Sequence, residues 1–401
     1  MTQSNAPGAR TDTQPDETPA FTRQSLAAQA MGRIEPETRA VVMPLHVATT
    51  FIRDPDNGYS SGYCYARPDN ATVREAESVL AMLEGADAGA LLFGSGMAAA
   101  TAVFGALEPG DHVVAGTVMY WALKRWLREE APRRGLSLTF VDTDDCDALR
   151  AAVEPGRTKL VWIETPGNPL WTVTDIAAAA EIAHAAGARL AVDSTAASPV
   201  HTCPLRLGAD IVMHSATKIL NGHSDVVAGV LAGAREDAFW ARIRAIRAGS
   251  GGILGPFEAY LLMRSLRTLH LRAAAQSAGA LRLAERLTGH PHVNQVLYPG
   301  LPEDPGHAVA RRQMRDGFGY MLSIRVAGGE AGAIATAARV RLWKRATSLG
   351  GVESLIEHRA SVEGPGSPCP TDLLRLSTGI EDTEDLLADL DQALRGAHAA
   401  P

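Results

Sequence analysis

The chain is poor in several features that mark particular classes of protein. Aromatic residues make up only 5% of its 401 residues, and no apolar run is long enough to cross a bilayer. Its four cysteines are scattered without a C-x-x-C pair, which argues against a disulfide framework and against a zinc site. The formal net charge is −7, whereas a nucleic-acid-binding protein typically has a basic face. We therefore expect no membrane span, no metal centre and no nucleic-acid partner.

The beginning of the chain has no pattern of a secretory signal. Residues 1–20 are polar, with Pro, Gly, Thr and Asp but no apolar h-region, so we expect a disordered tail there. Scattered cysteines are typical of free thiols in a reducing compartment, which favours a cytoplasmic protein. Hydrophobic residues make up 46% of the chain, which at this length predicts a large core divided between two domains.

The first of these domains has the pattern of an α/β protein. Between residues 65 and 262, short apolar segments alternate with alanine-rich helical segments. In one clear unit, a strand at 159–163 is followed by a helix at 175–186, which Gly187 ends, and by a strand at 189–193. This alternation predicts a mostly parallel, doubly wound sheet.

The pattern changes in the last third of the chain. A long basic helix is expected at 264–287, and an acidic amphipathic helix at 383–394, with shorter strands and helices between them. We therefore divide the chain into an N-terminal arm at 21–64, a large domain at 65–262 and a smaller α/β domain at 263–401.

The segment 214–218, HSATK, contains the most informative lysine. It follows a short apolar strand, and a buried amine is costly to keep charged, so the pKa of Lys218 is expected to fall. A neutral amine can attack a carbonyl and form a Schiff base, and the hydroxyls of Ser215 and Thr217 are placed to hold a phosphate. These features indicate pyridoxal 5'-phosphate (PLP). The alternative is a strand-end lysine that reaches solvent.

A glycine-rich turn precedes one of the expected helices. In open α/β sheets, ligands bind where strands end and helices begin. The sequence GSGM at 94–97 follows a strand at 90–93, and the N–H groups at a helix start can bind an anion. A plain turn is the alternative, and the segment lacks the G-x-G-x-x-G pattern of a Rossmann dehydrogenase.

Three polar residues follow other strands. Asp193 is suited to pair with a pyridinium nitrogen and keep the ring an electron sink, or else it caps a helix. Tyr120 is suited to stack on a planar cofactor, or else it is an ordinary packing residue. Asn168 lies in the loop ETPGNP, whose prolines would hold it near the cofactor ring, or else the loop is simply a rigid turn.

An arginine in the smaller domain has the setting of an anion-binding group. Arg375 lies in an alternating strand at 374–377, and an arginine on the buried face of a strand needs an anion as its partner. Its planar guanidinium matches a substrate carboxylate. If Arg375 faces water it is an ordinary surface residue, and the alternation alone does not decide between the two.

Together these motifs make the chain resemble the PLP-dependent trans-sulfuration enzymes, also called the Cys/Met metabolism family, over residues 25–395. The resemblance rests on nine ordered segments: YAR at 65–67, GSGMAA at 94–99, Tyr120, ETPGNP at 164–169, VDST at 192–195, SATK at 215–218, NGHSD at 221–225, SLGGVESL at 348–355 and LRLSTGIE at 374–381. It implies the PLP-dependent transferase fold type I, which is similar to aspartate aminotransferase, and a smaller C-terminal α/β domain.

The resemblance also implies a role for each matching residue. Lys218 would form the Schiff base and move protons, Asp193 would hold the pyridinium, and Tyr120 would stack on the ring and assist deprotonation. The remaining residues would bind the phosphate (Gly96, Met97, Ser215, Thr217), the phosphate of the neighbouring subunit (Tyr65, Arg67), or the substrate carboxylate and ring oxygen (Asn168, Ser348, Arg375). The protein would then be a homotetramer of two dimers with shared active sites, and its arm at 21–64 would contact the neighbouring subunit.

The chain departs from the family pattern near the expected substrate entrance. Trp121 and Ala122 follow the stacking tyrosine, and a cysteine characteristic of methionine γ-lyases would fall at Ala122. Ile219 stands where a tyrosine commonly follows the lysine. Arg359 replaces the proline of a frequent His-Pro-Ala, and Glu363 lies in the segment that replaces Met-Thr-His. These departures concern the identity of the substrate more than the cofactor chemistry.

The resemblance implies γ-elimination or γ-replacement on a homoserine-derived or cystathionine-like amino acid. Glu353 resembles the form found in cystathionine γ-synthases and γ-lyases, and it is a candidate substrate-binding residue. The alternatives are an O-acyl-homoserine sulfhydrylase, a methionine γ-lyase, which Ala122 disfavours, and a γ-lyase for a polar substrate such as canavanine. A non-catalytic homologue that binds PLP is a further alternative, against which the presence of Lys218, Asp193, Tyr120 and Arg375 argues.

Overall fold

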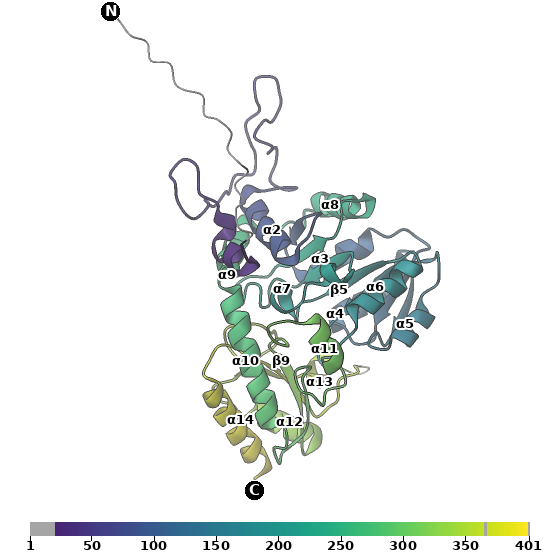
Figure 1. Ribbon diagram of the computed structural model, residues 1–401, viewed down its shortest axis with the longest axis vertical. Coiled ribbons are helices and arrows are strands. Elements are labelled where there is room, and N and C mark those ends of the chain that lie inside the picture. Colours follow the sequence, from purple (N-terminus) through teal and green to yellow (C-terminus); the bar gives the residue numbers. More distant parts are fainter. Residues whose placement is uncertain (1–20, 365–366, 400–401) are drawn as a thin grey trace, which may run out of the picture.

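The structure is a computed structural model that describes residues 21–364 and 367–399. The tail expected at 1–20 and two residues of the loop expected at 364–368 lie outside the described residues. Figure 1 shows a larger body around one sheet, a smaller body below it, and the N-terminal segments extending from the end opposite the C-terminus.

The larger body is built on a seven-stranded sheet in the order β1-β7-β6-β5-β4-β2-β3. All neighbouring strands are parallel except β7, which is antiparallel to both β1 and β6. Its strands, in chain order, are β1 (Ala90–Phe93), β2 (His112–Gly116), β3 (Ser137–Val141), β4 (Thr158–Glu164), β5 (Arg189–Asp193), β6 (Ile211–His214) and β7 (Gly229–Gly233). The expected mostly parallel sheet is confirmed.

Helices cover both faces of this sheet because its central strands are apolar on both faces. On β4, Leu160 and Trp162 pack against one face while Val161 and Ile163 pack against the other. The helices and short helical turns of this body are α2 (Ala71–Glu84), α3 (Gly96–Gly105), α4 (Trp121–Arg133), α5 (Cys146–Ala152), α6 (Ile176–Ala185), α7 (Ser198–His201), η2 (Pro204–Leu207) and α8 (Ala238–Ser250). The helix expected at 175–186 is α6, for which Asp175 is the N-cap.

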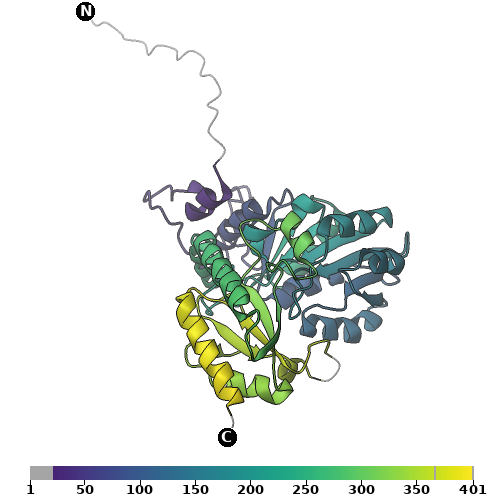
Figure 2. The same cartoon turned by 60° about the horizontal axis from the view of Figure 1, so that its bottom comes forward.

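The smaller body is a five-stranded sheet in the order β10-β11-β12-β9-β8, in which only β10 and β11 are parallel. Helices α10 (Leu269–Leu287) and α14 (Thr383–His398) lie side by side and pack on this sheet (Figure 2). Its elements are β8 (Val293–Leu297), α11 (His307–Gln313), β9 (Met321–Val326), α12 (Gly329–Ala337), β10 (Lys344–Arg345), β11 (Leu355–His358), α13 (Ala360–Glu363), β12 (Leu373–Ser377) and α14 (Thr383–His398). The smaller α/β unit is therefore confirmed, while the boundaries drawn between domains stay predictions.

One expected element is wrong. The helix expected at 264–287 is two helices, α9 (Pro256–Leu266) and α10 (Leu269–Leu287). Thr268 leaves the helical conformation with φ −111° and ψ 6°. Because the same basic and apolar pattern continues through the break, periodicity alone does not reveal it. Helix α9 packs against α2 of the larger body, whereas α10 contacts β8 and β9 of the smaller one.

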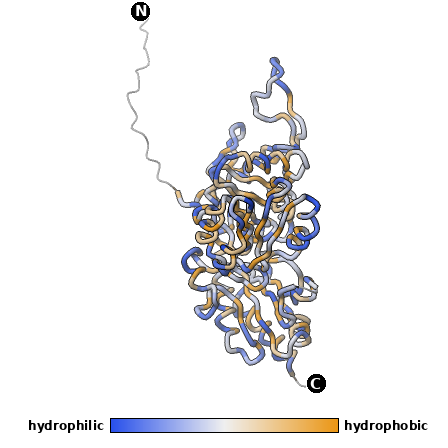
Figure 3. The backbone as a smooth tube through the Cα atoms, turned by 90° about the vertical axis from the view of Figure 1, so that its right-hand side faces the viewer, coloured by the Kyte–Doolittle hydropathy of each residue, from blue (hydrophilic) through white to orange (hydrophobic). Residues whose placement is uncertain are grey.

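The N-terminal arm has little regular structure. It contains only α1 (Arg23–Ala28) and the short η1 (Ala30–Gly32), and the chain then extends to α2 without another helix or strand. Figure 3 shows the apolar segments concentrated inside both bodies, with hydrophilic segments toward their edges. In the described part of the chain, no helix is both long and apolar enough to cross a membrane.

Candidate active site

A cavity of about 550 Å³ opens between the two bodies, where the parallel strands β4, β5 and β6 end. This volume lies in the range of small-molecule sites. The larger body supplies most of the lining, and the smaller body completes it with residues 347–349, Arg359, Val362 and Arg375. The cavity brings together most of the site residues expected from the sequence: Gly96, Met97, Tyr120, Asn168, Asp193, Ser215, Thr217, Lys218, Ser348 and Arg375.

The glycine-rich turn begins a helix, as expected. Ser95 is the N-cap of α3, and its Oγ accepts a hydrogen bond of 3.0 Å from the N–H of Ala98. The N–H groups of Gly96 and Met97 precede the first intrahelical bonds, so they remain available for an anion. A Cβ added at Gly96 would lie 2.9 Å from the Cβ of Ser215, so only glycine lets these two segments approach. The turn and the lysine segment therefore form one small, polar corner of the cavity.

Asp193 ends β5 and does not cap a helix. One of its carboxylate oxygens, Oδ1, accepts hydrogen bonds from the backbone N–H (3.0 Å) and the hydroxyl (2.6 Å) of Thr195. Burial raises the pKa of Asp193, and the bonds from Thr195 act in the opposite direction. Because both bonds from Thr195 end on Oδ1, the Oδ2 atom is left for a further donor in the cavity.

Glu164 is a site residue that the sequence reasoning did not single out. Its two oxygens accept the backbone N–H groups of Tyr120 (2.7 Å) and Asn168 (3.0 Å), so one carboxylate holds two segments of the cavity wall. Burial and the neighbouring Asp193 raise the pKa of Glu164 to about 8. A carboxylate at the end of an apolar strand was the available signal in the sequence, and the structure places it in register with Asp193 on β5.

Lys218 reaches into the cavity instead of out to solvent. Its Nζ donates a hydrogen bond of 2.9 Å to Oγ of Ser348, whose own backbone is left-handed with φ 94°. Burial, reinforced by the cationic Arg375 and Arg359, lowers the pKa of Lys218 to about 8. About a tenth of this amine is therefore neutral at pH 7, far more than of an ordinary lysine, and the neutral form is the one a nucleophilic amine requires.

Arg375 is buried, which decides the question that the alternation left open. Its guanidinium donates to Oδ1 of Asn168 (3.2 Å) and to the carbonyl oxygen of Ser348 (2.9 Å), and it forms an ion pair of 2.7 Å with Glu357. Burial and the neighbouring Arg359 lower the pKa of Arg375 to about 10. Because Lys218 and Arg375 both contact Ser348, the amine and the guanidinium lie close together.

Two of the departures from the family pattern belong to the same wall. Arg359 lines the cavity and forms ion pairs with Glu357 (2.9 Å) and with Glu363 (2.8 Å). Glu357 was missed by the sequence reasoning, although its place opposite Arg375 on the neighbouring strand follows from the pairing of β11 with β12.

Three of the expected site residues lie elsewhere. Tyr65 and Arg67 are exposed outside this cavity, and the Arg67 guanidinium lies 5.6 Å from the centre of the Tyr65 ring. Glu353 is hydrogen-bonded to Ser224 and does not line the cavity in the part of the chain that the structure describes. Thr217 does line the cavity, but its hydroxyl donates to the carbonyl oxygen of Ala228 and accepts from the N–H of the same residue. The roles of all these residues stay predictions.

A comparison with protein families identifies the chain. The model of the Cys/Met metabolism PLP-dependent enzymes matches residues 24–395. The chain belongs to this family. The expected membership, the fold type I architecture and the PLP cofactor are thereby confirmed.

The relatives within this family carry two activities in their names. A cystathionine gamma-synthase of Mycobacterium tuberculosis is 46% identical, covering 92% of this chain and 95% of its own length. A cystathionine gamma-lyase of Bacillus subtilis is 41% identical, covering 89% of this chain and 95% of its own. Among solved structures, metB from Corynebacterium glutamicum superposes with a TM-score of 0.91 at 40% identity, covering 94% of this chain and 99% of its own. A cystathionine gamma synthase from Xanthomonas oryzae, solved with aminoacrylate and cysteine, has a TM-score of 0.89 at 38% identity, covering 94% and 98%.

The cavity of this family member has the donor set that PLP needs. The first turn of α3 and Ser215 offer hydrogen-bond donors for a phosphate, and the Oδ2 of Asp193 remains for a ring nitrogen. The Lys218 amine lies in the same cavity with a lowered pKa. The residues present therefore fit the cofactor of the family.

Proposed function

We propose that this protein catalyses γ-elimination or γ-replacement on a homoserine-derived or cystathionine-like amino acid, in the manner of a cystathionine γ-synthase or γ-lyase. The observation that carries this proposal is one cavity that holds a low-pKa lysine, Lys218, beside a carboxylate, Asp193, and a buried guanidinium, Arg375. The names of its relatives, which are divided between the synthase and the lyase, support the same class of reaction.

Each of these residues has a distinct task in the proposed reaction. When bound, PLP withdraws electrons from the α-carbon of the amino acid. Arg375 binds the substrate carboxylate, and Asn168 and Ser348, which contact Arg375, position it. The Lys218 amine holds the cofactor and then moves protons at the α- and β-carbons, so that a γ-substituent can leave. Tyr120, whose segment is fixed by Glu164, covers the ring and assists the removal of the α-proton.

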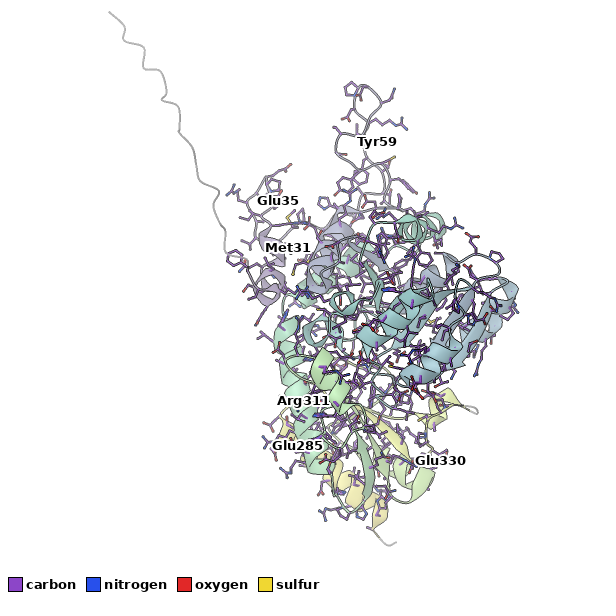
Figure 4. The ribbon with its side chains drawn as sticks, turned by 45° about the vertical axis from the view of Figure 1, so that its right-hand side comes forward. Met31, Glu35, Tyr59, Glu285, Arg311 and Glu330 are labelled. Carbon is purple, nitrogen blue, oxygen red and sulfur yellow. The ribbon has the colours of Figure 1, made fainter. Side chains whose placement is uncertain are left out.

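We further propose that the arm contacts a second copy of the chain in a cytoplasmic homotetramer with shared active sites. Among the described residues, fifteen large apolar side chains are exposed, and eight of them lie between Phe21 and Tyr65. Ile52 is 93% exposed and Val41 72%. Figure 4 shows Tyr59 on a loop that projects from the body, and Met31 and Glu35 on a second projection. Apolar side chains on projecting segments are typical of an association surface.

A substrate panel tests the proposed reaction. The PLP-loaded enzyme is given cystathionine, and separately O-succinyl- or O-acetyl-homoserine with cysteine or sulfide, while methionine, homocysteine and canavanine serve as comparisons. We expect turnover of cystathionine, or cystathionine formation from an acyl-homoserine and cysteine. Turnover of none of these amino acids, or turnover of canavanine or methionine alone, would contradict the proposal.

A mixing experiment tests the shared active site. Arg67→Ala should weaken PLP retention, because Arg67 is proposed to reach the phosphate of the neighbouring subunit. Mixed with a Lys218→Ala chain, it should regain part of the activity, since one site of each mixed dimer is then intact. Absence of any regain in tetramers shown by mass to contain both chains would contradict this arrangement.

A further inference from the structure

Four charged side chains form a continuous series of ion pairs along the small-domain wall of the cavity. The order is Arg375, Glu357, Arg359 and Glu363, with contacts of 2.7, 2.9 and 2.8 Å. Arg375, Glu357 and Arg359 are 3, 7 and 2% exposed, and the side chain of Glu363 is 5% exposed. Buried charges are stable only when they are paired, so the four groups depend on one another.

One oxygen stands at the centre of this series. Oε2 of Glu357 forms the ion pair with Nη2 of Arg375 and also accepts a hydrogen bond from Nη1 of Arg359. Arg375 is also the guanidinium proposed to bind the substrate carboxylate. The substrate carboxylate must therefore either share the Arg375 guanidinium with Glu357 or displace Glu357 from it. A displaced carboxylate that has no other partner is costly in a buried site.

We propose that Arg359 is a positioning residue that retains Glu357 when the substrate carboxylate binds to Arg375. The inference rests on the proposed function, and it assigns a task to a residue that stands where the family frequently has proline. With Arg359 present, two guanidinium groups face two carboxylates. Without it, one guanidinium would face Glu357 and Glu363, and the excess negative charge would repel an incoming carboxylate.

A matched pair of amines isolates this effect. L-Alanine and ethylamine differ by one carboxylate, and the binding of each to the PLP-loaded enzyme is followed by the change in the visible spectrum of the cofactor. In Arg359→Met, alanine should bind about tenfold more weakly or worse, while ethylamine stays within about twofold. Equal weakening of both amines, or no weakening of alanine, would overturn the proposal.

A second substitution distinguishes this role from a structural one. Glu357→Gln removes the competing charge, so the double variant Arg359→Met/Glu357→Gln should regain most of the alanine affinity. A double variant that binds alanine no better than Arg359→Met would overturn the proposal. A merely structural Arg359 would also lower the thermal unfolding temperature without any rescue by Glu357→Gln.

Two further variants keep the test decisive if Arg359→Met does not fold. Glu357→Gln alone should bind alanine at least as tightly as the unmodified enzyme, and Arg359→Lys, which keeps the charge, should bind it within about threefold. Looser binding by Glu357→Gln, or an alanine affinity of Arg359→Lys that falls tenfold, would overturn the proposal. Because these titrations use no γ-substituted amino acid, they succeed or fail independently of the proposed reaction.

Discussion

The two walls of the cavity are held together in different ways. The large-domain wall is fixed through the backbone: Glu164 and Asp193 end neighbouring strands in register, and both accept backbone N–H groups. The small-domain wall is fixed through side chains, because Arg375 and Arg359 are oriented by ion pairs with Glu357 and Glu363. A backbone-fixed wall suits a cofactor that stays, whereas a wall of exchangeable ion pairs suits a substrate that enters and leaves.

This difference indicates where specificity lies. The large-domain wall contains the residues expected to hold PLP, and it includes one departure from the family motifs, Trp121. In the small-domain wall, the departure Arg359 lines the cavity, and a second departure, Glu363, forms an ion pair with it. We therefore expect substitutions in the first wall to reduce kcat, and substitutions in the second wall to change KM.

The largest effect is expected at Lys218. Lys218→Ala should remove the visible absorbance of the bound cofactor and lower turnover by about a thousandfold or more, because no other amine lines the cavity in the described residues. Absorbance spectra and steady-state rates measure both effects. Lys159→Ala, which changes an exposed lysine on β4, is the control and should behave like the unmodified enzyme. Retained turnover in Lys218→Ala would refute its role.

A smaller effect on kcat is expected at Asp193. Asp193→Asn keeps an oxygen for the bonds from Thr195 but removes the negative charge that would hold a protonated ring nitrogen, so kcat should fall by about a hundredfold with little change in KM. Asp145→Asn, which keeps the N-cap of α5, is the matched control. A rise in KM at unchanged kcat would show that Asp193 acts in substrate binding, and it would contradict the difference between the large-domain and small-domain walls.

The opposite pattern is expected at Arg375. Arg375→Lys keeps the charge but loses the planar fork that reaches Asn168 and Ser348, so KM should rise by about tenfold to a hundredfold, and by more than kcat falls. Steady-state kinetics with the substrate found in the panel separate the two parameters. Arg345→Lys, on the exposed β10, should change neither.

The pH dependence of cofactor binding should follow the lowered pKa of Lys218. The neutral amine is the reactive form, so the rate at which cofactor-free protein takes up PLP should rise about tenfold per pH unit below pH 8 and level off above it. Stopped-flow absorbance measures this rate. A rate that keeps rising to pH 10 would show an ordinary lysine pKa and contradict the buried environment.

The lowered pKa of Lys218 also determines how the free energy of unfolding depends on pH. Between about pH 8 and the ordinary lysine pKa of 10.5, the unfolded chain carries a proton on Lys218 that the folded cofactor-free protein lacks. The contribution of Lys218 to the free energy of unfolding therefore rises with pH through this window, and it is least favourable below pH 8. Comparing the cofactor-free protein with Lys218→Met isolates the contribution, and a difference that falls with pH would contradict it.

The sequence predicted the large-domain wall better than the other because strand ends are local signals. An apolar run followed by Asp193, or by the lysine segment, marks both the strand and the end of the strand that faces the cavity. The burial of Arg375 was left open, since alternation does not say which face is covered. The pairing of Arg375 with Glu357 depends on the register of β11 and β12, which no local pattern reveals. The break at Thr268 was missed for the same reason, because it reflects packing on two different bodies.

The most direct test of the account is the identity of the oxo acid formed from cystathionine by the PLP-loaded enzyme. Cleavage at the γ-carbon, with uptake of one water, gives cysteine, ammonia and 2-oxobutanoate, and this is the result that the account predicts. Cleavage at the β-carbon, with uptake of one water, gives homocysteine, ammonia and pyruvate. Mass spectrometry distinguishes the two oxo acids, and pyruvate as the main product would contradict the assignment of γ-chemistry to this cavity.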